Sequence, residues 1–206
     1  MSWTDPDPTL FETGDVFTEG NFKTHVLDNL LALAHPLEAP TTADLDVVSS
    51  VAETTLYSVT VLGNTLGTVG SVLAELYGDT LYNNNVGDTV TLRVKFGGST
   101  QLQGAAFPLG TLDAARQPWY LRIVVANKGA TNSQVLYASL DGRPGNVTTP
   151  VVGLGRWDTR SVGAMISTSA IDTTVDQSLL VSVQWSVSSA NNSWRRRWAR
   201  TLIGQH

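Results

Sequence analysis

The run SLLVSVQWSV (Ser178–Val187) alternates apolar and polar residues along most of its length. A period of two is typical of a β-strand with one buried face, so Trp185 is expected to supply a large apolar side chain to a core. A second extended run, WRRRWARTLI (Trp194–Ile203), follows after the turn-rich Ser188–Ser193. Because Ser and Asn favour tight turns, the two runs are predicted to pair as an antiparallel hairpin.

Similar patterns recur through the middle of the chain and predict further strands that need the same core. They are separated by stretches rich in Gly, Asn and Asp, which are typical of turns. The predicted strands are Asp44–Val48, Thr54–Leu62, Val72–Gly78, Asp88–Phe96, Trp119–Ala126, Ser133–Leu140 and Val162–Ser167. Strands without intervening helices predict a mainly β protein, an antiparallel two-sheet sandwich of the jelly-roll type, preceded by an N-terminal arm and one short α-helix.

The composition limits the classes of protein to consider. Of 206 residues only 15% are charged and none is cysteine, which excludes disulfides and cysteine-based metal sites. The N-terminus has acidic residues where a secretory signal needs basic ones, and no apolar run is long enough to span a membrane. We therefore expect a soluble protein that is not inserted into a membrane and not exported by the usual secretory route.

The first 40 residues are predicted to form a separate attachment segment, followed by a β domain over residues 41–206. Residues 1–17 have isolated apolar side chains without a period, which fits either a docking arm or a disordered tail. A helix is predicted over about Glu19–Ala34, capped by Thr18 and ended by Pro36. The residues expected to dock on a partner or on copies of the chain are Phe17, Phe22, Val26, Leu30 and Leu33.

Charge is unevenly distributed along the sequence. Residues 1–60 contain ten acidic residues and one basic residue, whereas the rest contains eight acidic and twelve basic residues. The arginine run in WRRRWAR could bind nucleic-acid phosphates, or its arginines could stack on tryptophan and pair with acids across a subunit boundary. We favour the second interpretation, with no nucleic-acid partner. The candidate subunit contacts, which share one face of an ideal strand, are Trp194, Arg196, Trp198 and Arg200.

No catalytic signature stands out in the sequence. The three histidines, His25, His35 and His206, are placed for surface or packing roles rather than as bases or metal ligands. Seven aspartates could supply a pair of carboxylates as in glycosidases, but most stand beside turn residues, which favours capping and solvation. The segment GLGRW at Gly153–Trp157 lacks the third glycine of a dinucleotide site. We expect a protein that is not an enzyme and that has no cofactor and no metal.

Several stretches resemble a known family. TGDVFT at Thr13–Thr18, with NF at Asn21–Phe22 and DNLLAL at Asp28–Leu33, resembles the N-terminal segment of tailed-bacteriophage virion structural proteins. ETTLYS at Glu53–Ser58, with LYGD at Leu76–Asp79, TLRVKFGG at Thr91–Gly98 and the region 172–197, resembles the β domain of their tail-fibre and receptor-binding proteins. The resemblance implies a homotrimer, attached to the particle by its N-terminus and displaying a jelly-roll head.

The function expected from this resemblance is that of a trimeric tail-fibre or receptor-binding protein, located in the virion and made in the host cytoplasm. A capsid decoration protein or head fibre is the first alternative, and a carbohydrate-binding β-sandwich is the second. The expected partners are other virion proteins, copies of the chain and a host cell-surface glycan. Recognition is expected at loop tips, where amides and a tryptophan can contact a sugar; the candidate residues are Asn83, Asn84, Asn85 and Trp157.

Overall fold

The computed structural model describes residues 41–48, 50–84, 88–103, 107–108, 113–142 and 163–204. The predicted arm and helix with Phe17, Phe22, Val26, Leu30 and Leu33, the three histidines, and the loop residues Asn85 and Trp157 lie outside these ranges. The domain boundary near residue 40 therefore stays a prediction. No helix within the described ranges is long and apolar enough to cross a membrane.

The described chain consists of eleven β-strands. They are β1 (Leu45–Val48), β2 (Thr54–Val61), β3 (Ser71–Tyr82), β4 (Thr89–Phe96), β5 (Ser99–Gln103), β6 (Phe107–Pro108), β7 (Asp113–Asn127), β8 (Gln134–Gly142), β9 (Gly163–Ser169), β10 (Gln177–Trp185) and β11 (Asn192–Gly204). Every predicted strand corresponds to one of them. The structure adds β5 and β6 and extends β7 back to Asp113, so much of the stretch between the predicted strands Asp88–Phe96 and Trp119–Ala126 is strand where the sequence pattern predicted none.

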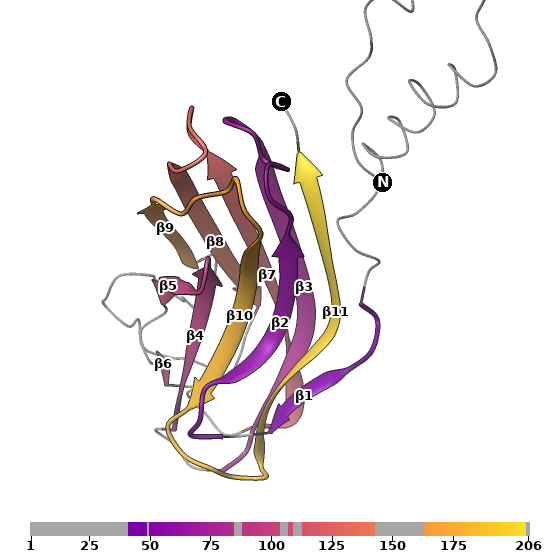
Figure 1. Ribbon diagram of the computed structural model, residues 1–206. Coiled ribbons are helices and arrows are strands. Elements are labelled where there is room, and N and C mark those ends of the chain that lie inside the picture. Colours follow the sequence, from indigo (N-terminus) through magenta and orange to yellow (C-terminus); the bar gives the residue numbers. More distant parts are fainter. Residues whose placement is uncertain are drawn as a thin grey trace, which may run out of the picture. The chain divides into compact units, whose positions relative to one another are not determined.

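The strands form two antiparallel sheets that pack face to face, which confirms the predicted mainly β sandwich of the jelly-roll type (Figure 1). One sheet has six strands in the order β1-β11-β3-β7-β8-β9, and the other has five, with the path β2-β10-β4-β5 and with β6 pairing β4. Most neighbours are distant in sequence. The central strand β10, for example, pairs with β2 on one side and β4 on the other.

The predicted C-terminal hairpin is wrong. Strand β10 belongs to the five-stranded sheet and β11 to the six-stranded sheet, so the segment between them crosses from one layer to the other. The turn residues are present as expected, and the amide of Asn192 donates to the carbonyl of Ser189. The physical reason is that each strand pairs extensively with strands other than its neighbour in sequence. Strand β11 pairs with β3 over almost its whole length, and β10 pairs with β2 and β4.

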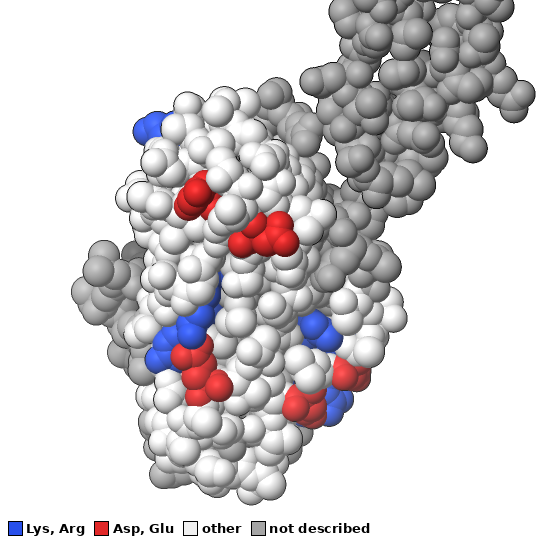
Figure 2. Space-filling view, viewed as in Figure 1, with Lys and Arg blue, Asp and Glu red and all other residues white. Residues whose placement is uncertain are grey.

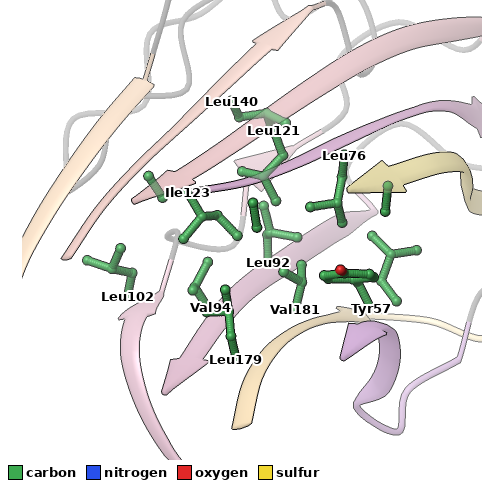
Figure 3. Packing of buried hydrophobic residues seen from close by; sticks show 14 of the residues in the cluster. Tyr57, Leu76, Leu92, Val94, Leu102, Leu121, Ile123, Leu140, Leu179 and Val181 are labelled. Carbon is green, nitrogen blue, oxygen red and sulfur yellow. The ribbon is translucent and has the colours of Figure 1, made fainter. Parts of the chain in front are cut away.

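The core lies between the sheets and is built from alternate residues of nearly every long strand (Figure 3). Trp185 is 2% exposed, which confirms its predicted place in the core. Burying a large apolar side chain contributes about 1.5–3 kcal/mol, so this layer supplies the main stabilisation. One polar contact also joins the two sheets inside the core, where the hydroxyls of Tyr57 on β2 and Thr201 on β11 lie 2.7 Å apart.

A β-bulge interrupts the pairing of β11 with β3 between Arg196 and Trp198. A bulge inserts one residue and so reverses which side chains point inward beyond it. Trp194 and Arg196 point into the sandwich before the bulge, and Ala199 and Thr201 do so after it. The predicted common face for Trp194, Arg196, Trp198 and Arg200 is therefore wrong, because an uninterrupted strand was assumed.

Candidate interaction surface

The outer face of the six-stranded sheet gathers the most distinctive side chains of the described residues. Trp198 on β11 lies opposite Tyr77 on β3, and Tyr77 lies opposite Tyr120 on β7. These three residues, called here the aromatic row, run across three neighbouring strands. Tyr77 is 45% exposed, so the row is open to solvent rather than covered by the same chain.

The rings of the aromatic row pack on one another. Tyr77 and Tyr120 are stacked, with ring centroids 4.5 Å apart and planes at 27°. Trp198 meets Tyr77 at 5.3 Å and 59°, and the Arg200 guanidinium lies 5.4 Å from the Trp198 ring centroid. Such pairs contribute about 0.5–1.5 kcal/mol beyond their buried area. Each ring of the row is therefore held in place by at least one neighbouring side chain.

A carboxylate on β3 fixes one side of the aromatic row. Glu75 accepts a hydrogen bond from the Tyr120 hydroxyl at 2.5 Å and from Arg200 Nε at 2.7 Å. Burial alone would raise the pKa of Glu75, but the hydrogen bonds from Tyr120 and Arg200 outweigh it and hold the pKa below its usual value. Burial, together with Glu75, raises the pKa of the Tyr120 phenol. Near neutral pH, Glu75 is therefore an ionised carboxylate and the Tyr120 phenol keeps its proton.

A cluster of ion pairs, called here the ion-pair cluster, borders the other side of the aromatic row. Asp79 accepts hydrogen bonds from Arg116 and Arg197. Asp46 pairs with Arg195 at 2.5 Å, and Asp44 accepts from Arg197 at 3.0 Å. Burial alone would raise the pKa of Asp79, but Arg116 and Arg197 lower it overall.

The ion-pair cluster modifies one prediction. Pairing of the arginine run with acidic residues from the first 60 was expected, and Asp44 and Asp46 belong to that region. The pairs form within one chain, however, rather than across a subunit boundary. They tie the short edge strand β1, whose only buried side chain is Val47, to its neighbour β11.

The structure separates the four predicted subunit contacts. Trp194 is 0% exposed and packs beside Trp119, with ring centroids 5.4 Å apart, and Arg196 is 8% exposed. Arg196 donates to the backbone carbonyls of Leu56 and Ala43 and lies over the Tyr57 ring. These two residues are inside the single chain and so are wrong as subunit contacts. Trp198 and Arg200 lie on the outer face, where a contact stays a prediction.

The predicted receptor residues within the described ranges are Asn83 and Asn84, both exposed after the end of β3. Asn84 Nδ2 donates to the Asp88 carboxylate at 2.8 Å, and Asn192 Nδ2 donates to the same oxygen at 2.9 Å. The backbone amide of Asn83 donates to Asn191 and Asn192. The Asn84 side chain is therefore already engaged by Asp88, and its role in recognition stays a prediction.

The outer face of the five-stranded sheet has a different character. Its strands carry hydroxyl and amide side chains with few charges, and Figure 2 shows the charged groups of this side as small, separate clusters. One cluster lies on this sheet, where Lys95 Nζ is 2.5 Å from Glu53 Oε1 and the Ser182 hydroxyl donates to the same oxygen at 2.5 Å. Neither this cluster nor the aromatic row was predicted from the sequence.

Sequence alternation could have revealed part of the outer face. In LAELYGD (Leu73–Asp79), Glu75, Tyr77 and Asp79 occupy every second position and so share a face. Alternation does not reveal which strands pair with β3. It is the pairing of β3 with β11 and β7 that brings Trp198 and Tyr120 beside Tyr77. Within the described ranges, no group of three or more His, Cys, Asp or Glu residues is arranged to hold a metal ion.

Comparison with known proteins gives matches among solved structures. No protein-family model and no curated protein sequence matches the chain. Among solved structures it is similar to lectin I-B4 from Griffonia simplicifolia in its metal-free form, at 9% identity over 74% of this chain and 78% of that chain, with a TM-score of 0.29. It is also similar to a Lotus tetragonolobus seed lectin, at 10% identity over 73% and 79%, with a TM-score of 0.32. Lectin UEA-II complexed with galactose matches at 9% identity over 74% and 78%, with a TM-score of 0.30. At TM-scores this low, no function is carried over from these lectins to this chain.

Proposed function

We propose that the chain is a structural protein of a tailed-phage particle, a trimeric tail-fibre or receptor-binding protein whose β-sandwich contacts other copies through the outer face of the six-stranded sheet. The sequence resemblance supports the class of protein. The aromatic row supports the place of the contact. Trp, Tyr and Arg are the residue types enriched where protein interfaces bind most strongly, and Trp198, Tyr77, Tyr120 and Arg200 are adjacent here.

The same face extends beyond the aromatic row onto β9, where Ile166 is 73% exposed. Ile166 lies opposite Tyr137 on β8, so large side chains also occupy this part of the outer face, where another protein can cover them. The charges favour a copy of this chain as that protein. Among the described residues, this face has five arginines and four acidic residues, and all but Arg122 form ion pairs. The arginines are Arg116, Arg122, Arg195, Arg197 and Arg200, and the acidic residues are Asp44, Asp46, Glu75 and Asp79. Such a balanced face can meet its own copy without net repulsion.

Packing of the rings argues for a protein partner rather than a sugar at the aromatic row. A sugar stacks on an open aromatic face. Tyr77 and Tyr120 use faces for each other, and Arg200 lies over Trp198. The row is already ordered before binding, which lowers the conformational entropy that association costs.

Sedimentation of the full chain tests this proposal. The wild type is expected to be a trimer at micromolar concentration, and Trp198→Ala is expected to weaken association by about 30-fold, since loss of an interface hot spot costs about 2 kcal/mol or more. Leu180→Ala, a partly buried leucine on the outer face of the other sheet, is the matched control and should leave the mass unchanged. A monomeric wild type, or a Trp198→Ala variant that stays fully trimeric, would overturn the proposed contact.

A capsid decoration protein or head fibre could use the same contact at a different place on the particle. Electron microscopy of assembled particles with this protein labelled distinguishes a position on the tail from a position on the capsid. Label on the tail supports the fibre or receptor-binding role, and label spread over the capsid supports the alternative.

Carbohydrate recognition is a second candidate function, and the five-stranded sheet favours it. Its outer face offers rows of hydroxyl and amide groups, which make paired hydrogen bonds with sugars; they include Thr55, Ser58, Thr60, Thr91, Gln103, Ser178 and Gln184. A host cell-surface glycan would be the natural ligand of a receptor-binding protein. Binding of the full chain to a glycan array tests this function, and an array without any bound glycan would contradict it.

A further inference from the structure

The outer face of the five-stranded sheet holds a carboxylate in a group of three donors. Glu53 Oε1 accepts from Lys95 Nζ and the Ser182 hydroxyl, both at 2.5 Å, and Arg93 Nη1 lies 3.8 Å from Glu53 Oε2. The register explains the grouping, because Ser182 on β10 is opposite Arg93 on β4, and Lys95 is two residues further along the same face. The hydrogen bonds from Lys95 and Ser182 lower the pKa of Glu53, so the bound group is a carboxylate anion.

The cations in this group exceed the anions. Strands β2, β4, β5 and β10 contain only two charged residues, Arg93 and Lys95, and Glu53 directly precedes β2. Arg93 is also only partly satisfied, because its Nε donates to Gln103 while its buried Nη1 has no hydrogen-bond partner among the described residues. In the described part of the chain, Glu53 is thus the one acidic residue paired with these two basic residues, Arg93 and Lys95, and the strands of this sheet contain no other charged residue.

Glu53 differs from its partners in how firmly it is held. Arg93, Lys95 and Ser182 stand on central strands, whereas Glu53 belongs to the short segment 50–53 between β1 and β2. The backbone of this segment is anchored by Ser50, which accepts from the Trp185 amide, and by Val51, which accepts from Gln184. The Glu53 side chain can therefore turn away by rotation about its own bonds, while the three donors stay in place.

From these contacts we infer that Arg93, Lys95 and Ser182 form an anion site for the carboxylate of an acidic saccharide, a site that Glu53 occupies when no ligand is bound. The inference rests on the proposed carbohydrate recognition and specifies its ligand class. Lys95 and Ser182 already hold a carboxylate by hydrogen bonds, with Arg93 close by, and the surplus positive charge favours an anionic ligand in its place. The neighbouring Thr55, Thr91 and Gln103 are placed in register to bind the ring hydroxyls of the same sugar.

Calorimetric titration of the full chain with a tetramer of galacturonic acid tests this site, with the carboxyl-reduced neutral tetramer as the matched ligand. The wild type should bind the acidic tetramer and prefer it to the neutral one. Lys95→Gln should weaken binding by about tenfold or more, since one charge-assisted hydrogen bond is lost. Glu53→Gln should strengthen binding, because it removes the competing carboxylate. Lys128→Gln, the same change of charge at an exposed turn residue, is the control and should change little.

Each other result overturns the inference in a distinct way. Equal binding of both tetramers would leave carbohydrate recognition standing but remove the preference for acidic sugars. Equal weakening by Lys95→Gln and Lys128→Gln would show attraction to net charge rather than a site. Absence of binding to both tetramers, with a positive glycan array, would place recognition elsewhere. If Glu53→Gln binds more weakly while its melting temperature is unchanged, Glu53 is a ligand-binding residue and not a competitor.

Discussion

Replacing Asp79 by Asn probes how strongly the ion-pair cluster holds the six-stranded sheet together. The Asp79 side chain is 11% exposed and accepts from two arginines, of which Arg116 is 24% and Arg197 49% exposed. The more exposed pair with Arg197 is worth about 0.2–1 kcal/mol, and the more buried one with Arg116 about 1.5–3 kcal/mol. Asp46 and Asp44 stay close to these arginines and limit the charge left unpaired. We expect Asp79→Asn to lower the free energy of unfolding by about 2 kcal/mol at pH 7.

The effect should depend on pH in one direction. Because the pKa of Asp79 is lower in the folded state, its stabilisation is complete above its unfolded pKa of about 4 and is lost as pH falls through the folded pKa. Glu53 and Glu75 also have lowered pKa values, but they are present in both proteins and cancel in the comparison. Urea unfolding of both proteins from pH 7 to pH 3 measures the difference. A gap below about 0.5 kcal/mol at pH 7, or one that does not shrink in acid, would refute the reasoning.

Two further predictions concern the packing of the same sheet. In Gly78→Ala the new Cβ would lie 1.9 Å from the Arg195 carbonyl oxygen and 2.4 Å from Trp119 Cζ2, so denaturant unfolding should show a loss of about 3 kcal/mol or more. Gly98→Ala, where nothing lies within 4 Å and only the φ of 77° opposes a side chain, should lose about 1 kcal/mol, and equal losses would contradict the close packing around Gly78. Tyr120→Phe removes the hydrogen bond to Glu75 and should cost about 1 kcal/mol by the same assay. Tyr137→Phe on neighbouring β8 is its control, and a loss equal to that of Tyr120→Phe would mean that the Glu75 bond contributes nothing.

Alternation was sufficient to predict the strands and the fold class, because each long strand has one face in the core. The aromatic Trp185 and the alternating residues of 90–96 and 119–125 lie where that pattern placed them. Sheet membership was not predictable in the same way, since Ser and Asn residues between two strands serve equally for a hairpin and for a crossing between layers. Strand β5 was missed because STQLQ has one buried residue, Leu102, and so shows little period.

The candidate surface depended on features that local sequence does not contain. The bulge at Arg197 reversed the inward and outward positions of β11, so two of the four arginine-run residues predicted to meet a subunit lie inside the sandwich instead. The arginine run does pair with acidic residues of the first 60, as the uneven distribution of charge predicted. The pairs form within one chain, however, because the pairing of β1 with β11 brings Asp44 and Asp46 to these arginines. The aromatic row likewise joins residues from three strands that are far apart in sequence.

The contact between copies can be located directly with single spin labels, because the chain has no cysteine of its own. One variant of the full chain has its label at Ile166→Cys on the outer face of the six-stranded sheet, and the other has it at Thr60→Cys on the outer face of the five-stranded sheet. Pulsed electron spin resonance then measures the distances between labels on different copies. If the six-stranded sheets face one another in the oligomer, the labels at residue 166 will be clearly closer together than those at residue 60. Shorter distances between the labels at residue 60 would contradict the proposed contact.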